Sequence, residues 1–446
     1  MSDYIVAIDL GTSHLTGIVG EKKTNGKFSV FAHETIETDT CIHRGIIYNS
    51  DNTTAHVGNL IGKLEGRLNG KYIDKVYIGV GGQSLRTIDH IEAMDIKDGA
   101  SVTEADILAL KEKCEKFKPN LVDVLGMAPP VYFLDGRKDT KADGVLCSSL
   151  EAHYKLVVGR VSIRQNIKKS IEAIPDKKLA GIIVAPLALA DAVLSAKDKE
   201  LGCALVDFGA GVTSVSIYKN GDLRHLCVIP FGGKLINRDL ASLQLVGADA
   251  ENIKKRKGSA IFNNVNENEH ITIEMEGVDR EIKLSDLNAV IEGRAKEIVD
   301  NVSARISEVI EPRLLGRGII LAGCASELTN LNELIKEKCG LNTRPAVIKK
   351  GLVEGSDDML GNPLYMMAIS LMLKGTEPCV TKLNRTKNPE EDAGNTLDQG
   401  EVKEEAKEDD KHKKQGKTPP EKKPKAERRG LKEKIKVYFE LFKDEE

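Results

Sequence analysis

The 446-residue sequence predicts an α/β protein with two duplicated lobes, and three observations favour this fold. The run Val6-Ala7-Ile8-Asp9-Leu10-Gly11-Thr12-Ser13 lies near the start, and Ala204-Leu205-Val206-Asp207-Phe208-Gly209-Ala210-Gly211-Val212-Thr213 resembles it about 200 residues later. In both runs an apolar, β-prone stretch is broken at Asp-x-Gly and followed by a second apolar stretch. A third glycine-rich turn, Gly318–Ser326, follows another apolar stretch and precedes a predicted helix over 328–338. Repeated strand–turn–strand units indicate a duplicated fold.

Each repeated run predicts two antiparallel strands joined by a tight glycine turn, with returning strands at 15–19 and 215–218. The N–H groups of such a turn can hold phosphate oxygens, and a carboxylate at its base can hold the water shell of Mg²⁺. One copy is weak evidence, because Asp-x-Gly is also an ordinary surface turn. Two copies predict facing half-domains with a phosphate chain between them. The candidate phosphate-binding residues are Gly11, Thr12, Ser13, Gly209 and Gly211, and the Mg²⁺-associated pair is Asp9 and Asp207.

Two further segments predict the part of the site that would face a nucleoside. Gly323 ends the third apolar strand, and a strand, glycine turn and helix N-terminus together bring backbone dipoles to a ligand. In the segment 249–258, Glu251 and Lys254 share one face of a predicted helix, a spacing able to reach a ribose or base. The alternative is a solvated surface helix. From the spacing alone, the surface helix is favoured over a ligand contact.

In this order, the segments resemble the actin, Hsp70 and sugar-kinase superfamily, with its two phosphate motifs and its adenosine motif. Within it, the chain is most similar to the FtsA family of bacterial cell-division proteins. The resemblance covers roughly residues 1–380 and the last twenty. Stretches outside the shared turns carry it: Cys41-Ile42-His43-Arg44-Gly45-Ile46-Ile47-Tyr48-Asn49, Val76 to Gly82, Ile229-Pro230-Phe231-Gly232-Gly233-Lys234 through Ala241, and Ala250 to Gly258.

The resemblance implies an actin-like (ribonuclease H-like) two-lobe fold with an inserted FtsA-type subdomain, and it implies ATP and Mg²⁺ as cofactors. We expect lobe I at 1–84 and 162–198, the insertion at 85–161, the lobe II core at 199–238 and 316–382, and an outer subdomain at 239–315. The insertion differs from its surroundings in its predicted pattern of strands and helices. Strands over 84–96, a helix over 103–117 capped by Ser101 or Thr103, and a strand over 151–161 predict a small, independent unit.

Composition restricts the function classes. The content of hydrophobic residues, 41%, allows sizeable cores, and a net charge of −3 makes nucleic acid an unexpected partner. The eight cysteines are scattered without a C-x-x-C pair, which is typical of reduced core residues in a cytosolic protein. The sequence predicts neither a signal peptide nor a membrane-spanning helix.

The C-terminal part predicts a disordered, charged linker over 383–427 and an amphipathic helix over 428–446. The linker has almost no large apolar residues, and as a flexible coil its ends would lie about 35 to 40 Å apart. A lone amphipathic helix with basic flanks can dock on the chain's own body or on a partner helix, or it can insert into an anionic membrane surface, which we favour. The expected membrane-inserting residues lie on one stripe: Leu431, Ile435, Tyr438, Phe439 and Phe442.

The second phosphate motif departs from the family pattern. Ala210 and Val212 add side chains where backbone would approach phosphate, and Ser214 replaces a carboxylate. The segment Ile182–Ala188 has no Glu or Gln where many relatives keep a residue that orients the attacking water. We therefore expect nucleotide binding with slow or absent hydrolysis, and not an efficient enzyme.

By resemblance, the protein would self-associate with nucleotide and anchor the tubulin-like protein FtsZ to the cytoplasmic side of the cell membrane at the division site, where it would also help to recruit other division proteins. The C-terminal tail of FtsZ would dock on the 239–315 subdomain, with Arg294 as a candidate contact. Alternatively, Arg294 is a surface residue that pairs with Glu297 or with no other residue. Two other functions stay open. They are a pilus-assembly scaffold of the actin type and a small-molecule kinase of the same superfamily.

Overall fold

A computed structural model describes residues 3–38, 41–97, 100–139, 141–262, 269–275, 278–354 and 357–382 of the chain. The chain divides into two units, Met1–Leu383 and Asn384–Glu446. The second unit lies outside the described residues, and with it the predicted linker over 383–427 and the predicted helix over 428–446. In the described ranges, no helix is both long enough and apolar enough to cross a membrane.

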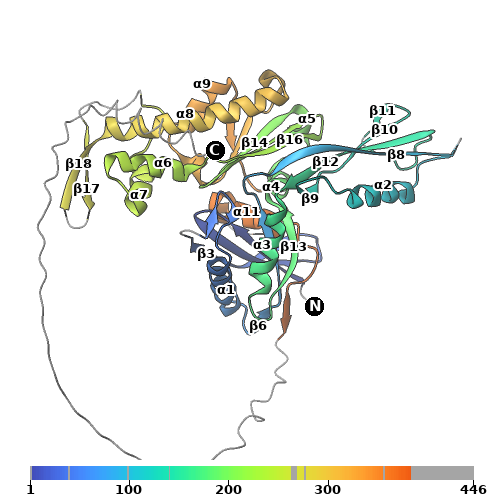
Figure 1. Ribbon diagram of the computed structural model, residues 1–446, viewed down its shortest axis with the longest axis horizontal. Coiled ribbons are helices and arrows are strands. Elements are labelled where there is room, and N and C mark those ends of the chain that lie inside the picture. Colours follow the sequence, from blue (N-terminus) through green and yellow to red (C-terminus); the bar gives the residue numbers. More distant parts are fainter. Residues whose placement is uncertain are drawn as a thin grey trace, which may run out of the picture. The chain divides into compact units, whose positions relative to one another are not determined.

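The first lobe contains a six-stranded sheet of order β13-β7-β1-β2-β3-β21 (Figure 1). β1, β2 and β3 are antiparallel neighbours, and β7 pairs in parallel with both β1 and β13. The strands are β1 (Asp3–Leu10), β2 (His14–Lys22), β3 (Phe28–Glu37), β7 (Lys75–Val80), β13 (Lys178–Val184) and β21 (Val353–Glu354), with the short pairs β4 (Ile42–His43) with β5 (Ile46–Ile47) and β6 (Lys71–Ile73) with β22 (Val380–Lys382) beside them.

Helices cover both faces of this sheet, because successive strand residues point to opposite sides. Gly17 of β2 packs against Leu60 and Leu64 of α1, whereas Gly20 packs against Met372 of α11. The absence of a Cβ at both glycines lets the helices approach the strand closely. The helices of this lobe are α1 (Ser50–Gly66), α3 (Val161–Glu172), α4 (Ala185–Val193), α5 (Ala196–Leu201), which leads into the second lobe, α10 (Asp357–Gly361) and α11 (Pro363–Met372).

The second lobe repeats this topology. Its strands follow the order β16-β15-β14-β19-β20, with β14, β15 and β16 antiparallel and β19 parallel to β14 and β20. In chain order, these five strands correspond one to one with β1, β2, β3, β7 and β13, so the predicted duplication is confirmed. The elements are β14 (Cys203–Phe208), β15 (Thr213–Lys219), β16 (Asp222–Ile229), β19 (Ile319–Ala322), β20 (Thr343–Pro345), α9 (Leu331–Cys339) and the short 3₁₀ turns η2 (Pro312–Leu314) and η3 (Cys324–Glu327).

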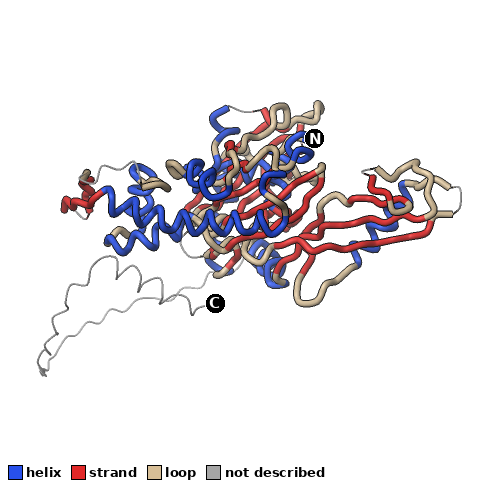
Figure 2. The backbone as a smooth tube through the Cα atoms, turned by 90° about the horizontal axis from the view of Figure 1, so that it is seen from above, coloured by secondary structure: helices blue, strands red, loops and turns tan. Residues whose placement is uncertain are grey.

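The strands of the insertion pair with one another and join the second-lobe sheet at one residue pair. β8 pairs with β16 at Arg86 and Cys227, so strands of the insertion and of the second lobe form one ten-stranded sheet (Figure 2). The strands of the insertion otherwise pair with one another, and the insertion has its own buried cluster around Leu110 and Leu150. Its elements are β8 (Arg86–Asp95), α2 (Glu104–Lys116), β9 (Asp123–Met127), β10 (Val131–Leu134), β11 (Arg137–Asp139) and β12 (Ser149–Gly159).

Local capping explains where the helix of the insertion begins. The hydroxyl of Thr103 accepts a hydrogen bond from the N–H of Asp106, and the Asp106 carboxylate accepts one from the N–H of Thr103. This reciprocal capping box satisfies two N–H groups that a helix start leaves open. Of the two caps expected from the sequence, Ser101 and Thr103, the structure uses Thr103.

The outer subdomain is joined to the second lobe by one long helix, α8 (Leu284–Val309) (Figure 1). Leu287 and Ile291, near its start, lie in the buried cluster of the outer subdomain, whereas Val299 and Val302 lie in that of the second lobe. One amphipathic helix therefore contributes buried side chains to two hydrophobic cores. The other elements are α6 (Gly233–Asp239), η1 (Leu240–Leu243), α7 (Gly247–Lys257), β17 (His270–Met275) and β18 (Val278–Lys283).

The end of the described chain returns to the first lobe, which corrects one predicted boundary. We expected residues 316–382 in the second lobe, but β21 pairs with β3, α11 packs on β1 and β2, and β22 pairs with β6. The apolar side chains of α11 pack on one face of the first sheet, where Gly20 and Gly79 leave room for Met372 and Leu371. Gly20 and Met372 are about 350 positions apart in the sequence, so no local pattern reveals their contact.

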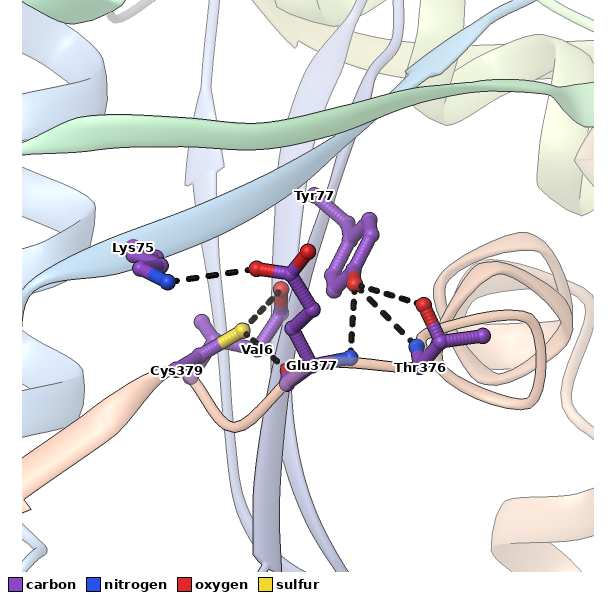
Figure 3. Close-up of polar contacts among 6 residues, drawn as sticks. All are labelled: Val6, Lys75, Tyr77, Thr376, Glu377 and Cys379. Atoms are coloured by element: carbon purple, nitrogen blue, oxygen red, sulfur yellow. Dashed lines mark hydrogen bonds and ion pairs between the residues drawn. The ribbon is translucent and has the colours of Figure 1, made fainter.

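A hydrogen-bonded clasp holds the segment after α11 (Figure 3). The Tyr77 hydroxyl oxygen accepts hydrogen bonds from the N–H groups of Thr376, 3.1 Å away, and Glu377, 2.9 Å away. Lys75 pairs with the Glu377 carboxylate at 3.2 Å, and the N–H of Cys379 donates to the Tyr4 carbonyl at 2.7 Å. The clasp holds the end of the described chain on the first sheet.

Replacing Tyr77 by Phe should loosen this clasp. The Tyr77 side chain is buried. Without its hydroxyl group, two N–H groups lack an acceptor, which lowers the free energy of unfolding by about 1 to 2 kcal/mol. We expect faster amide hydrogen exchange over 376–382 and a small fall in melting temperature. Tyr72→Phe is the control, because the Tyr72 hydroxyl has no hydrogen bond within the described ranges. Equal exchange in wild type and Tyr77→Phe would contradict the prediction.

Candidate functional site

Two carboxylates lie at equivalent positions of the duplicated lobes. Asp9 is the penultimate residue of β1 and pairs with Thr16, and Asp207 is the penultimate residue of β14 and pairs with Ser214. Both side chains are only partly exposed. The duplication therefore places the two carboxylates that the sequence singled out at the same point of two sheets.

The site raises the pKa of both carboxyl groups. Burial raises the pKa of Asp9 to about 7, with a further contribution from the negative charge of Asp207. Burial also raises the pKa of Asp207 to about 6. Burial disfavours the charged forms of both carboxyl groups, and a bound cation would favour them. The pair is therefore suited to hold a cation.

The two glycine turns touch each other. A Cβ at Gly211 would overlap the side chain of Thr12, so bare backbone of the second turn packs against the first. Lys234 spans the same gap, and its Nζ donates to the Thr12 carbonyl at 2.9 Å. The predicted pairing of the turns is thus present in the structure, with Gly11, Thr12 and Ser13 on one side and Gly209 and Gly211 on the other.

The second turn is supported from behind by the Gly232-Gly233 segment. The N–H of Gly233 donates to the Gly209 carbonyl at 2.9 Å, and the N–H of Lys234 donates to the Ala210 carbonyl at 2.8 Å. A Cβ at Gly232 would overlap the backbone of Gly209 and Ala210. Close backbone packing explains why the sequence has two glycines here.

Gly323 lies directly against the second carboxylate. Its φ is +81°, in the region that favours glycine, and a Cβ there would overlap Asp207 Oδ1 and the Phe208 carbonyl. Its neighbours Ala322 and Ser326 line a cavity of about 420 Å³. The predicted adenosine turn therefore adjoins Asp207, and residues beside it line an open volume.

Glu251 and Lys254 form a tight network that faces the second turn. Lys254 Nζ lies 2.7 Å from Glu251 Oε2, 2.8 Å from Asn237 Oδ1 and 3.3 Å from the Gly233 carbonyl. Burial alone would raise the pKa of Glu251, but hydrogen bonds from Lys254 and Asn237 outweigh it and hold the pKa at about 2. Burial lowers the pKa of Lys254. A solvated surface helix, the alternative from spacing alone, does not describe Lys254, whose side chain is only 11% exposed.

Several residues of the site were not singled out individually by the sequence analysis. Thr38 donates from its N–H to the Ser13 carbonyl at 2.8 Å, and Gly45 donates to Thr12 Oγ1 at 3.0 Å. Burial lowers the pKa of His14, whose ring lies in the field of Glu37, Lys255, Glu251 and Lys234. Lys234 belongs to the stretch Ile229–Lys234, which carries part of the family resemblance. The sequence did not predict that Lys234 contacts the first turn.

Arg294 does not lie at the surface, which corrects the expectation of an exposed tail contact. The residue is 7% exposed, its Nε donates to Asp239 Oδ2 at 2.6 Å and its Nη2 to Asp239 Oδ1 at 3.2 Å. It also pairs with Glu297. A tail carboxylate could reach this guanidinium only by displacing Asp239.

A second cavity, of about 440 Å³, lies between α7 and β17. Arg256 and Lys257 supply positive charge, and Ile253, Ile271 and Ile273 supply an apolar wall. Among the described residues, no group of three or more His, Cys, Asp or Glu side chains is arranged to hold a metal ion by itself. The predicted residues Leu431, Ile435, Tyr438, Phe439 and Phe442 lie outside the described residues.

Comparisons with known proteins give a consistent result. A family model described as cell division protein FtsA matches residues 204–370. The chain is 33% identical over 385 residues to a cell division protein FtsA of Porphyromonas gingivalis, a match that covers 85% of this chain and 80% of the relative. It is 28% identical over 378 residues to a cell division protein FtsA of Pseudomonas aeruginosa, covering 84% and 89%. A chain of the PilM-PilN type IV pilus biogenesis complex has a similar fold, with a TM-score of 0.59 and 15% identity, covering 84% of this chain and 99% of that one.

Proposed function

The chain belongs to the FtsA family of cell division proteins, and from this membership we propose that it is an ATP-binding, self-associating protein that anchors FtsZ to the cytoplasmic side of the cell membrane at the division site. Its partners would be the FtsZ C-terminal tail, further copies of itself, anionic lipid and later division proteins. The observation that carries the nucleotide part is the contact of the two glycine turns around Asp9 and Asp207.

ATP would occupy the space beside the two turns, with its phosphates near the backbone of Gly11, Thr12, Ser13, Gly209 and Gly211. Asp9 and Asp207 would hold the hydrated Mg²⁺ that accompanies the phosphates, since Mg²⁺ retains several waters. Gly323 with Glu251 and Lys254 would contact the adenosine, and the contact of Gly323 with Asp207 supports this position. Ala210 and Val212 in the second turn, and the segment Ile182–Ala188 without Glu or Gln, support slow or absent hydrolysis.

The FtsZ tail would dock on the outer subdomain. The groove between α7 and β17 is lined by Arg256, Lys257 and one carboxylate, Asp249, beside an apolar wall, and its net positive charge is complementary to an acidic tail. This groove replaces Arg294 as the proposed contact. The pilus-scaffold alternative rests on fold similarity alone, because the PilM-PilN chain is only 15% identical.

The membrane part of the proposal rests on the sequence pattern of 428–446. Five bulky residues fall on one helical stripe, and six Arg or Lys flank it, each worth about 1 kcal/mol near anionic lipid. A single such helix binds reversibly, whereas a polymer presents many helices and binds firmly by avidity.

Co-sedimentation with vesicles of anionic and neutral lipid tests the proposal. We expect the full chain to pellet with anionic vesicles, more strongly with Mg²⁺ and ATP, and a chain that ends at Glu427 to lose at least about tenfold in binding. Phe439→Glu should weaken pelleting similarly at unchanged length. Glu433→Gln, off the stripe, should not. Equal pelleting of the full and shortened chains would refute the anchor.

A further inference from the structure

Lys234 connects the two lobes at the place where the glycine turns meet. It belongs to the second lobe, and its side chain reaches the first turn, where Nζ donates to the Thr12 carbonyl at 2.9 Å. The Thr12 side chain in turn lies against the bare backbone of Gly211. The ammonium group of Lys234 is therefore placed beside any phosphate chain that runs between the two turns.

The backbone around Lys234 is fixed against the second turn. The N–H of Lys234 donates to the Ala210 carbonyl at 2.8 Å, and the N–H of Gly233 donates to the Gly209 carbonyl at 2.9 Å. Gly232, which precedes α6, packs so closely on this turn that a Cβ would overlap the Ala210 carbonyl. Two hydrogen bonds and this close packing hold the lysine at a defined distance from the turn.

The charge of Lys234 differs in its setting from that of two neighbouring lysines. Nζ of Lys254 lies 2.7 Å and Nζ of Lys255 lies 3.3 Å from a carboxylate oxygen of Glu251. The Thr12 carbonyl that accepts from Lys234 has no net charge, so this hydrogen bond leaves the positive charge of the ammonium group in place. Burial lowers the pKa of His14, which directly follows the first turn, and the positive charge of Lys234 lowers it further. The field of Lys234 thus reaches the first turn.

A phosphate chain at this site would need positive charge beyond that of one Mg²⁺. The pair Asp9 and Asp207 is negative when it holds the cation, and each added phosphate brings further negative charge. An ammonium group has three N–H donors, so it can hold a carbonyl and donate to a phosphate oxygen at the same time. Such a charge-assisted hydrogen bond is stronger than one between neutral groups.

We propose that Lys234 makes the site selective for nucleotides with a phosphate chain over nucleoside monophosphates, by donating from Nζ to the phosphates between the two turns. This inference rests on the proposed nucleotide function. It assigns to Lys234 a role in specificity that a residue holding the lobes together would not have.

Isothermal calorimetry of the full chain with Mg²⁺ tests the proposal, with a non-hydrolysable ATP analogue and with AMP measured by competition. Lys234→Met keeps the length of the side chain and lacks its charge. We expect this variant to bind the ATP analogue at least about tenfold more weakly and AMP within about twofold of wild type. Lys234→Arg keeps the charge and should lose less than about threefold for either ligand.

Lys168→Met is the matched control for the loss of one positive charge. Lys168 lies on α3, and its side chain is 63% exposed, so the variant should bind both ligands as wild type does. Salt gives a second measurement. Raising NaCl from about 50 to about 300 mM should weaken binding of the ATP analogue more in wild type than in Lys234→Met, because the variant has lost one charge interaction.

A purely structural role of Lys234 gives a different result. Lys234→Met would then melt at a lower temperature without nucleotide and would weaken both ligands by the same factor. That outcome would overturn the inference while the nucleotide site stands. If Lys234→Met does not fold, Lys234→Gln takes its place, since it keeps a donor for the Thr12 carbonyl without the charge. A wild-type chain that binds neither ligand would overturn the proposed nucleotide function and this inference with it.

Discussion

Asp9→Asn should stabilise the nucleotide-free protein at pH 8 and abolish its stabilisation by Mg²⁺ and ATP. The folded state holds the pKa of Asp9 at about 7, above the ordinary value of 3.8, so the folded chain retains a proton that the unfolded chain releases between those values. Stability therefore falls as pH rises from about 4 to 7. The substitution removes this penalty, which is on the order of 2 to 4 kcal/mol above pH 7. Thermal melts at pH 5 and pH 8, with and without Mg²⁺ and ATP, measure both effects.

At pH 5 the Asp9→Asn and wild-type proteins should melt within a few degrees of each other, because Asp9 is then mostly protonated. Asp89→Asn is the control, since that carboxylate is 73% exposed and should show neither effect. An Asp9→Asn protein that is less stable than wild type at pH 8 would contradict the pKa argument. One that is stabilised by Mg²⁺ and ATP as strongly as wild type would contradict the role of Asp9 in the site.

Arg294→Ala should destabilise the outer subdomain by about 3 to 5 kcal/mol, because it leaves the buried Asp239 carboxylate without its partner. Asp239 ends α6 and Arg294 lies in the middle of α8, so the pair joins the two helices. We expect amide exchange in 233–257 and 284–294 to accelerate at least about a hundredfold, while the first lobe is unaffected. Local exchange is the suitable measurement, since a chain with several cores does not unfold in two states.

Lys296→Ala on the same helix provides the matched control. Its partner Glu292 lies one turn away, and the Lys296 side chain is 40% exposed, so its loss should cost less than about 0.5 kcal/mol. If Arg294→Ala behaves like Lys296→Ala, the buried pair contributes little to the stability of the outer subdomain, which would contradict the prediction.

Much of the candidate site was predictable, because its signals are local. The Asp-x-Gly turns at Asp9 and Asp207 need only a strand, a tight turn and a returning strand, and turn chemistry of this kind is written in neighbouring residues. Gly323 was visible for the same reason. The contacts between these pieces were not visible, since Gly211 meets Thr12 and Lys234 meets the Thr12 carbonyl across about 200 residues of sequence.

Which charged side chains are buried could not be predicted from the sequence. Arg294 and Glu297 fit an exposed helix face by spacing, and nothing near them in sequence shows that Asp239 lies beneath. Likewise, the apolar residues of α11 predict a buried helix without showing which sheet covers it. Burial depends on the elements that pack around a residue, and these come from distant parts of the chain.

The sequence by itself determined that the chain is a duplicated α/β protein and which residues form its glycine turns. Periodicity, turn residues and composition act within a few positions, so they can be recognised without coordinates. Only the tertiary structure decided that the insertion joins the second sheet, that the chain end returns to the first lobe, and that Lys234 reaches the Thr12 carbonyl. These are pairings between distant segments, and their free energy comes from packing that exists only in the folded state.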